Sequence, residues 1–286
     1  MKLLWFVLIF LELTPSSCPP PPHPPTPRQM FIAAGEWDQA NEMCQRVTNA
    51  STDGSTSSDD NFEAIMINTL IDVVHQGKDV KENFQRLLMS LSRNEPNNAK
   101  IHFEMSRLFA RLSGRNRELL QMTVKLVSNA CELEPKNSEY VAEKGYQYRL
   151  MGNYGMALDT YKDASRIDES NVEASYGMIY CQLMQGQVED AEQQLEFLSV
   201  IQGSDGSNQS ASLTFLKALI ALRKDKNAPL HLKLLNLAVE QHEQSQRENP
   251  ASDIFLIYYN FNPDFLVEIA KVSERSERAL RKMSDK

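Results

Sequence analysis

Residues 138–171 read SEYVAEKGYQYRLMGNYGMALDTYKDASRIDESN, and this stretch aligns without a gap on the 34 residues that follow it. The alignment pairs Gly152 with Gly186, Ala157 with Ala191, Tyr146 with Tyr180, Glu139 with Glu173 and Asn137 with Asn171. A period of about 34 residues is that of the tetratricopeptide repeat, a helix–turn–helix unit. The repeat therefore predicts an all-α protein, a tetratricopeptide-type α-solenoid of stacked antiparallel helix pairs, whose function is binding and not chemistry.

The small and aromatic residues of this repeat fall where two helices must pack. Gly145 and Tyr148 lie on the predicted first helix, where a missing side chain lets the second helix approach and a ring fills the space beside it. Gly152 breaks that helix, because glycine adopts positive φ without steric cost. The second helix carries four residues at steps of three and four, which places them on one face; they are Tyr154, Ala157, Tyr161 and Ala164.

Other copies of the repeat are fainter. The copy after residue 171 keeps Gly186, Ala191 and Leu195 but has Gln182 at the aromatic position, so it is a degenerate repeat. Further helices are predicted at 37–47, 62–76, 79–93, 99–134 as a pair split near Gly114, 211–224 and 229–246. The predicted domains are 1–30, an apolar leader with a proline-rich linker; 31–260, the helical repeats; and 261–286, a terminal helix and tail. Asn262, Pro263 and Asp264 would cap and begin the terminal helix.

Composition and charge narrow the class of protein. The chain has 286 residues, of which 42% are hydrophobic and 24% charged, as in ordinary folded soluble proteins. Its net charge of −8 argues against a nucleic-acid partner, because a phosphate-binding surface needs an excess of Lys and Arg. Four arginines between Arg107 and Arg117 form a local basic cluster, which is more simply a solvated helix end.

No reaction centre is recognisable in the sequence. The five histidines form no HExxH grouping, so we expect no metal, and no glycine pattern would hold the phosphates of a cofactor. The segment 203–207 lacks the flanking strand and the spacing of a nucleophile or phosphate loop. Cys44, Cys131 and Cys181 suit helix faces where a small apolar residue is buried. We expect no enzymatic activity, no cofactor and no small-molecule substrate.

The beginning of the chain differs from the rest. Leu3–Leu11 is an apolar run too short to span a bilayer and of the length of a signal-peptide core. Pro19–Pro27 is proline-rich and predicts an extended linker. The leader has two interpretations: a genuine export signal within residues 1–17, or an aberrant start joined to a fragment of a longer chain. Sequons at Asn49 and Asn208 would matter only under the first.

Several stretches, Leu234–Asn236 among them, resemble one known family. The run from Cys181 to Leu198, the segment from Tyr258 to Ala270 and the segment from Trp37 to Val47 are similar to the tetratricopeptide repeat protein 21 family, and the likeness covers roughly 31–270. The resemblance implies a non-catalytic subunit of intraflagellar transport complex A, acting in retrograde ciliary transport and cilium assembly. It implies other subunits of that complex as partners and the cilium and cytoplasm as location. This chain departs from the family in its leader and in its charged tail, 273–286.

Partner binding would fall to side chains on the first helices of the repeats. The candidates by position are Lys144, Gln147, Arg149, Tyr176 and Gln182. An alternative to the ciliary scaffold is a secreted or luminal tetratricopeptide adaptor, which cleavage after the leader would distinguish. An enzyme with an unrecognised site is a third hypothesis, which an activity screen without turnover would leave unsupported.

The packing assigned to the repeat can be tested at Ala157. Replacing it with Trp is expected to unfold the repeat, because overpacking a helix contact costs about 1–3 kcal/mol or more. Thermal melting followed by circular dichroism measures the effect, and an unchanged melt would refute the assigned contact.

Overall fold

A computed structural model describes residues 36–50, 58–75, 80–113, 115–201, 210–224, 230–248 and 266–274. Every regular element within these ranges is an α-helix, which confirms the predicted all-α class. The leader 1–30, the link 203–207 and the cap 262–264 lie outside the described residues, and both sequons extend beyond them. Among the described helices, none combines the length and apolar character needed to cross a bilayer.

The chain divides into two units, each built of helix pairs. The first comprises residues 1–133 with 250–261, and the second comprises 134–249 with 262–286. The described helices of the first unit are α3 (Trp37–Ala50), α4 (Ser58–His75), α5 (Val80–Asn94), α6 (Ala99–Leu112) and α7 (Arg117–Leu133). Its core includes Phe84 and Phe109, whose rings meet edge to face with centroids 5.0 Å apart. Of the fainter copies of the repeat, those predicted before residue 134 lie in this unit.

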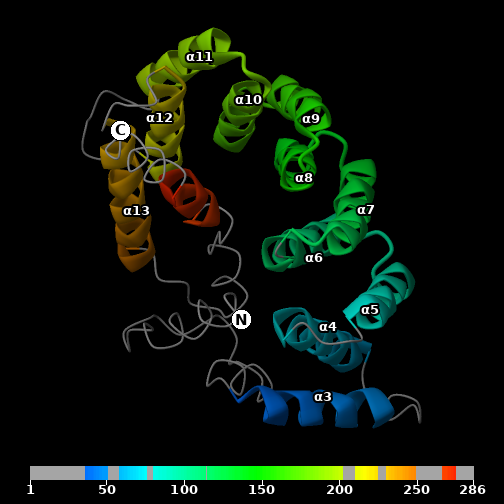
Figure 1. Cartoon of the computed structure of the whole chain (residues 1–286). Helices are drawn as coiled ribbons and strands as arrows, with labels where there is room; N and C mark the ends of the chain where they lie inside the picture. The colour runs from blue at the N-terminus through cyan, green and yellow to red at the C-terminus, as the bar shows by residue number, and fades with distance from the viewer. Residues whose placement is uncertain are drawn as a thin grey trace. The chain divides into compact units, whose positions relative to one another are not determined.

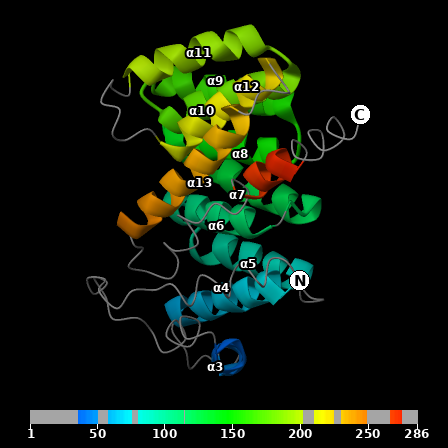
Figure 2. The ribbon, with the colours of Figure 1, turned by 60° about the vertical axis from the view of Figure 1, so that its left-hand side comes forward.

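The second unit contains the repeat that defines the fold. Its helices are α8 (Ser138–Leu150), α9 (Tyr154–Ile167), α10 (Val172–Gln185), α11 (Val188–Ile201), α12 (Ala211–Lys224) and α13 (Leu230–Glu248), with a further helix at 266–274. The order of these helices can be followed in two views (Figures 1 and 2). Helix α10 contacts both α8 and α12, so the first helices of successive pairs lie next to one another. This is the stacking of a tetratricopeptide-type α-solenoid.

Local signals define the ends of these helices. Asn137 and Asn171, one repeat apart, accept hydrogen bonds through Oδ1 from the backbone N–H groups of Glu139 (3.2 Å) and Ala174 (2.9 Å). Such caps satisfy N–H groups that the first turn of a helix leaves unpaired. Gly152 and Gly186 have φ of 78° and 84°, in the left-handed region that favours glycine. The turn predicted at Gly152 is therefore present, and its repeat equivalent Gly186 has the same conformation.

The Tyr161 ring is the centre of packing in the second unit. It is 2% exposed and lies between Gly145 of α8 and Gly177 of α10. A Cβ atom on Gly145 would stand 3.0 Å from the ring, and one on Gly177 only 2.2 Å from it. The close approach predicted at Gly145 is thus present, and Gly177 is a second contact that the repeat pattern did not indicate.

The remaining residues of the repeat signature follow the same packing. Ala157, Ala164 and Ala191 are fully buried, and Leu195 is 5% exposed, as expected for the inner faces of α9 and α11. Tyr148 and Tyr154 are half-buried, and the ring beside Gly145 is that of Tyr161 and not, as the repeat pattern had suggested, that of Tyr148. Glycine and alanine at these contacts let the helices approach closely, while Tyr161 fills the space between them.

We predict that Gly177→Ala destabilises the protein by about 1–3 kcal/mol, because its methyl group would overlap the buried Tyr161 ring. Gly155→Ala in α9 is the matched control. Its methyl group would have only Gln185 Nε2 nearby, at 3.9 Å, so alanine should be neutral or slightly stabilising there. Urea unfolding of both variants measures the difference, and equal stabilities would contradict the packing of Tyr161.

Candidate functional site

The candidate site is built around Arg149, near the end of α8. Its guanidinium Cζ lies 4.8 Å from the ring centroid of Tyr146 and 4.5 Å from that of Tyr180. Both distances are within the range of cation–π attraction. Tyr146 and Tyr180 occupy the same position in consecutive repeats, so the 34-residue period brings two first-helix tyrosines to one cation.

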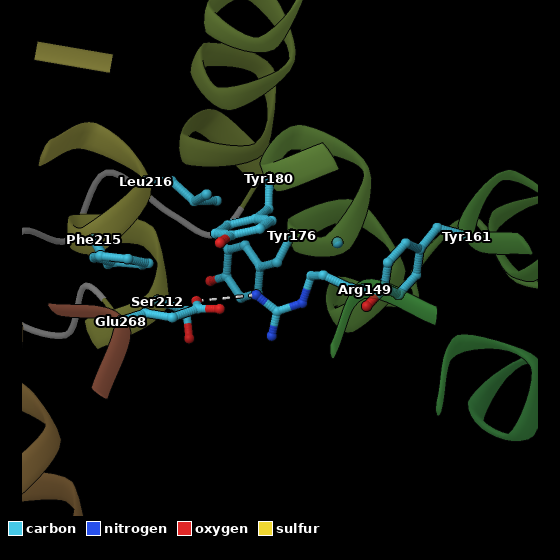
Figure 3. Close-up of a pocket in the computed structure, with 9 residues that line it drawn as sticks. Arg149, Tyr161, Tyr176, Tyr180, Ser212, Phe215, Leu216 and Glu268 are labelled. Atoms are coloured by element: carbon cyan, nitrogen blue, oxygen red, sulfur yellow. Dashed lines mark hydrogen bonds and ion pairs between the residues drawn. The ribbon is translucent and has the colours of Figure 1, made fainter. Parts of the chain in front are cut away.

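Glu268 completes the site from a distant part of the sequence. Arg149 Nη1 donates a hydrogen bond to Glu268 Oε2 over 3.3 Å, across a separation of 119 residues (Figure 3). The two side chains are 13% and 9% exposed, so this ion pair is largely removed from water. A buried charge of this kind is tolerated only when it is paired, which makes the helix at 266–274 electrostatically dependent on α8.

The surroundings hold Arg149 in its charged form. Burial alone would lower the pKa of Arg149, but the Glu268 carboxylate and the neighbouring tyrosines outweigh it and raise the pKa well above its ordinary value. Burial raises the pKa of Tyr161 well above its usual range, against the opposing effect of Arg149. Burial likewise raises the pKa of the Cys181 thiol to about 12. The site thus contains a charged Arg149 paired with the Glu268 carboxylate, beside a tyrosine and a thiol that burial keeps neutral.

A small cavity opens beside the ion pair. It has a volume of about 60 Å³ and is lined by residues from α8, α9, α10, α12 and helix 266–274. The lining residues are Arg149, Tyr161, Tyr176, Gly177, Tyr180, Ser212, Phe215, Leu216 and Glu268 (Figure 3). Pockets for drug-sized ligands measure roughly 300–1,000 Å³. The cavity is therefore well below the size of a pocket for a drug-sized ligand.

The structure separates the five predicted partner-binding residues into two groups. Arg149 and Tyr176 line the cavity, and the Tyr176 hydroxyl lies 2.5 Å from Ser210 Oγ, within hydrogen-bonding distance. Gln147 and Gln182 are buried, and Gln147 Nε2 donates to Glu143 within α8. Lys144 is half-buried and does not line the cavity. A binding role for these five residues stays a prediction.

Sequence reasoning missed several residues of the site. Tyr146 and Tyr180 match in the alignment of the two repeats. Because they occupy the same position on neighbouring first helices, this match was a signal from which their proximity to Arg149 could have been predicted. Glu268 lies outside the aligned repeats, so no periodic signal connected it to α8. Within the described part of the chain, no group of three His, Cys, Asp or Glu side chains is arranged to hold a metal ion.

Comparisons with known proteins agree with the helical-repeat class that the fold defines. Residues 82–277 match the family model described as "Tetratricopeptide repeat protein 21 second ARM domain". Tetratricopeptide repeat protein 21B of Homo sapiens is 36% identical over 243 residues, covering 84% of this chain and 18% of the relative. Tetratricopeptide repeat protein 21A of Homo sapiens is 28% identical over 253 residues, covering 85% of this chain and 18% of the relative. The chain belongs to the tetratricopeptide repeat protein 21 family, and it spans under a fifth of the length of these relatives.

Two solved structures are similar to the chain at low sequence identity. A tetratricopeptide repeat protein from Parabacteroides merdae has 16% identity and a TM-score of 0.46, with 86% of this chain and 96% of that chain covered. The PilF protein of Pseudomonas aeruginosa has 14% identity and a TM-score of 0.43, with 84% and 94% covered.

The energetic role of the ion pair can be measured by removing one or both charges. Glu268→Gln should destabilise the protein by about 3 kcal/mol, because it leaves the buried Arg149 cation without its carboxylate. Combining Arg149→Met with Glu268→Leu should recover most of that loss, since apolar side chains of similar volume often replace a buried ion pair without penalty.

The exposed pair Arg166 and Asp163, 2.6 Å apart with side chains 74% and 59% exposed, is the control. Arg166→Met should change stability by no more than about 0.5 kcal/mol. Guanidinium unfolding gives the values, and a double variant less stable than Glu268→Gln would contradict the cost assigned to the unpaired Arg149 cation.

Proposed function

We propose that this chain is a non-enzymatic interaction scaffold that acts with intraflagellar transport complex A in retrograde ciliary transport and cilium assembly. The observation that carries the proposal is the family match over residues 82–277. Stacked helix pairs present extended surfaces made of neighbouring repeats, which is the means by which such proteins bind other proteins. The partners we propose are other subunits of that complex, and the location is the cilium and cytoplasm.

The chemistry of the Arg149 site supports a binding function over a catalytic one. Catalysis needs a nucleophile, acid or base whose protonation state can change during the reaction. Here the buried groups are held in one state, because the pKa values of Tyr161 and Cys181 are raised by burial and Arg149 stays charged. A fixed cation between aromatic rings is suited to recognising a carboxylate.

A secreted or luminal adaptor is the second candidate function. The observation that favours it is the apolar run Leu3–Leu11, which has the length of a signal-peptide core. Mass spectrometry of the natural amino terminus separates the two candidates, because a secreted adaptor would lose its leader by cleavage and the ciliary scaffold would not.

Affinity purification tests the proposed partners. An epitope-tagged chain without residues 1–30, expressed in ciliated cells, should co-purify with subunits of intraflagellar transport complex A. The same tagged chain carrying Ala157→Trp is the control, because its disrupted repeat should bind less of each subunit. Recovery of no subunit of the complex by the folded chain would contradict the proposal.

A further inference from the structure

Helix 266–274 lies against the first helices of the second unit through one charged and several apolar contacts. Glu268 forms the ion pair with Arg149, and Ile269 is 5% exposed. Leu266 and Val272 pack, half-buried, on the same apolar cluster, to which α10 and α12 contribute most of the buried residues. The helix therefore presents a carboxylate followed by apolar residues one and four positions later.

The surface that receives this helix is largely formed without it. Tyr146 and Tyr180 contact the Arg149 guanidinium from α8 and α10, independently of Glu268. Phe215 and Leu216 of α12 supply the apolar part of the cavity. Arg149 Nε is buried and has no hydrogen-bond acceptor among the described residues, so the cation has capacity beyond the bond to Glu268. We call this surface, made of Arg149, Tyr146, Tyr180, Phe215 and Leu216, the arginine seat.

The helix has little stability apart from the seat. In proteins most of a helix's stability comes from the packing of one face and not from intrinsic propensity, and the face that this helix packs carries Glu268 and Ile269. Its helical form therefore depends on the seat, whereas the seat depends mainly on the stacked repeats.

We propose that the arginine seat is a binding site for an acidic amphipathic helix of a partner protein, and that helix 266–274 occupies it within the chain until such a helix replaces it. The partner helix carries a Glu or Asp with apolar residues one and four positions later, because helix 266–274, which now occupies the arginine seat, has this pattern. The proposal rests on the scaffold function above and names the chemistry of one partner contact.

The test is competition for the seat in the full chain. The probe is a fluorescently labelled peptide of residues 262–275, and binding is measured by fluorescence anisotropy. Ile269→Asp should loosen the internal helix and strengthen peptide binding at least tenfold over the unaltered chain. Lys271→Ala, on the exposed side of the same helix, is the matched control and should leave binding unchanged.

Charge recognition is tested in the same assay. Adding Arg149→Met to Ile269→Asp should weaken peptide binding at least tenfold, and so should a peptide with Gln in place of Glu268. Circular dichroism checks that each variant keeps its helices. If Ile269→Asp unfolds the chain, Glu268→Gln takes its place, since it removes the ion pair and preserves side-chain shape.

Two outcomes would overturn the proposal. Peptide binding that is no stronger in the loosened variant would show that helix 266–274 is a permanent part of the unit. Dimers formed by exchange of this helix, detected by light scattering, would make a second copy of the chain the occupant. Neither outcome affects co-purification with the transport complex, so the two proposals fail separately.

Discussion

The contact of the Tyr161 ring with two glycines is the constraint on which the second unit depends. Gly145 and Gly177 have no side chains where the ring lies, and a methyl group on Gly177 would overlap it. Tyr161 belongs to α9, while the glycines belong to α8 and α10, so one residue determines how closely three helices approach. Close packing of this kind tolerates little change of volume, because protein interiors have few voids to absorb it.

The charged site follows from that packing. With α8 and α10 held side by side, the equivalent tyrosines of two repeats meet the guanidinium of Arg149. Removing this cation from water carries a large desolvation cost, which the aromatic faces and the Glu268 carboxylate offset. The same arrangement explains why helix 266–274 has a defined place in the unit.

In the proposed scaffold function, a surface of this composition would discriminate between partners. A cation held between rigid rings loses little conformational entropy on binding, and an unmatched apolar residue opposite it would leave the charge buried without a partner. Complementary charge therefore favours binding of a helix with a matching carboxylate and disfavours binding of a helix without one. The family membership and the repeat architecture fit a protein whose role is to hold other proteins together.

What the sequence determined by itself was the repeat. The period places Gly152 and Gly186 at positive-φ turns and Asn137 and Asn171 at helix caps, and these are local properties that neighbouring residues decide. The resemblance to the family was also visible in the sequence, because it rests on continuous runs of residues such as Cys181–Leu198.

Only the tertiary structure decided the site. Gly177 could not be predicted because the residue one repeat earlier is Glu143, so the period gave no hint that a glycine was needed against Tyr161. Arg149 and Glu268 are 119 residues apart, and Glu268 lies outside the aligned repeats. Such a contact depends on where helix 266–274 packs. Its position follows from burial and charge in the folded unit, and no local sequence pattern predicts it.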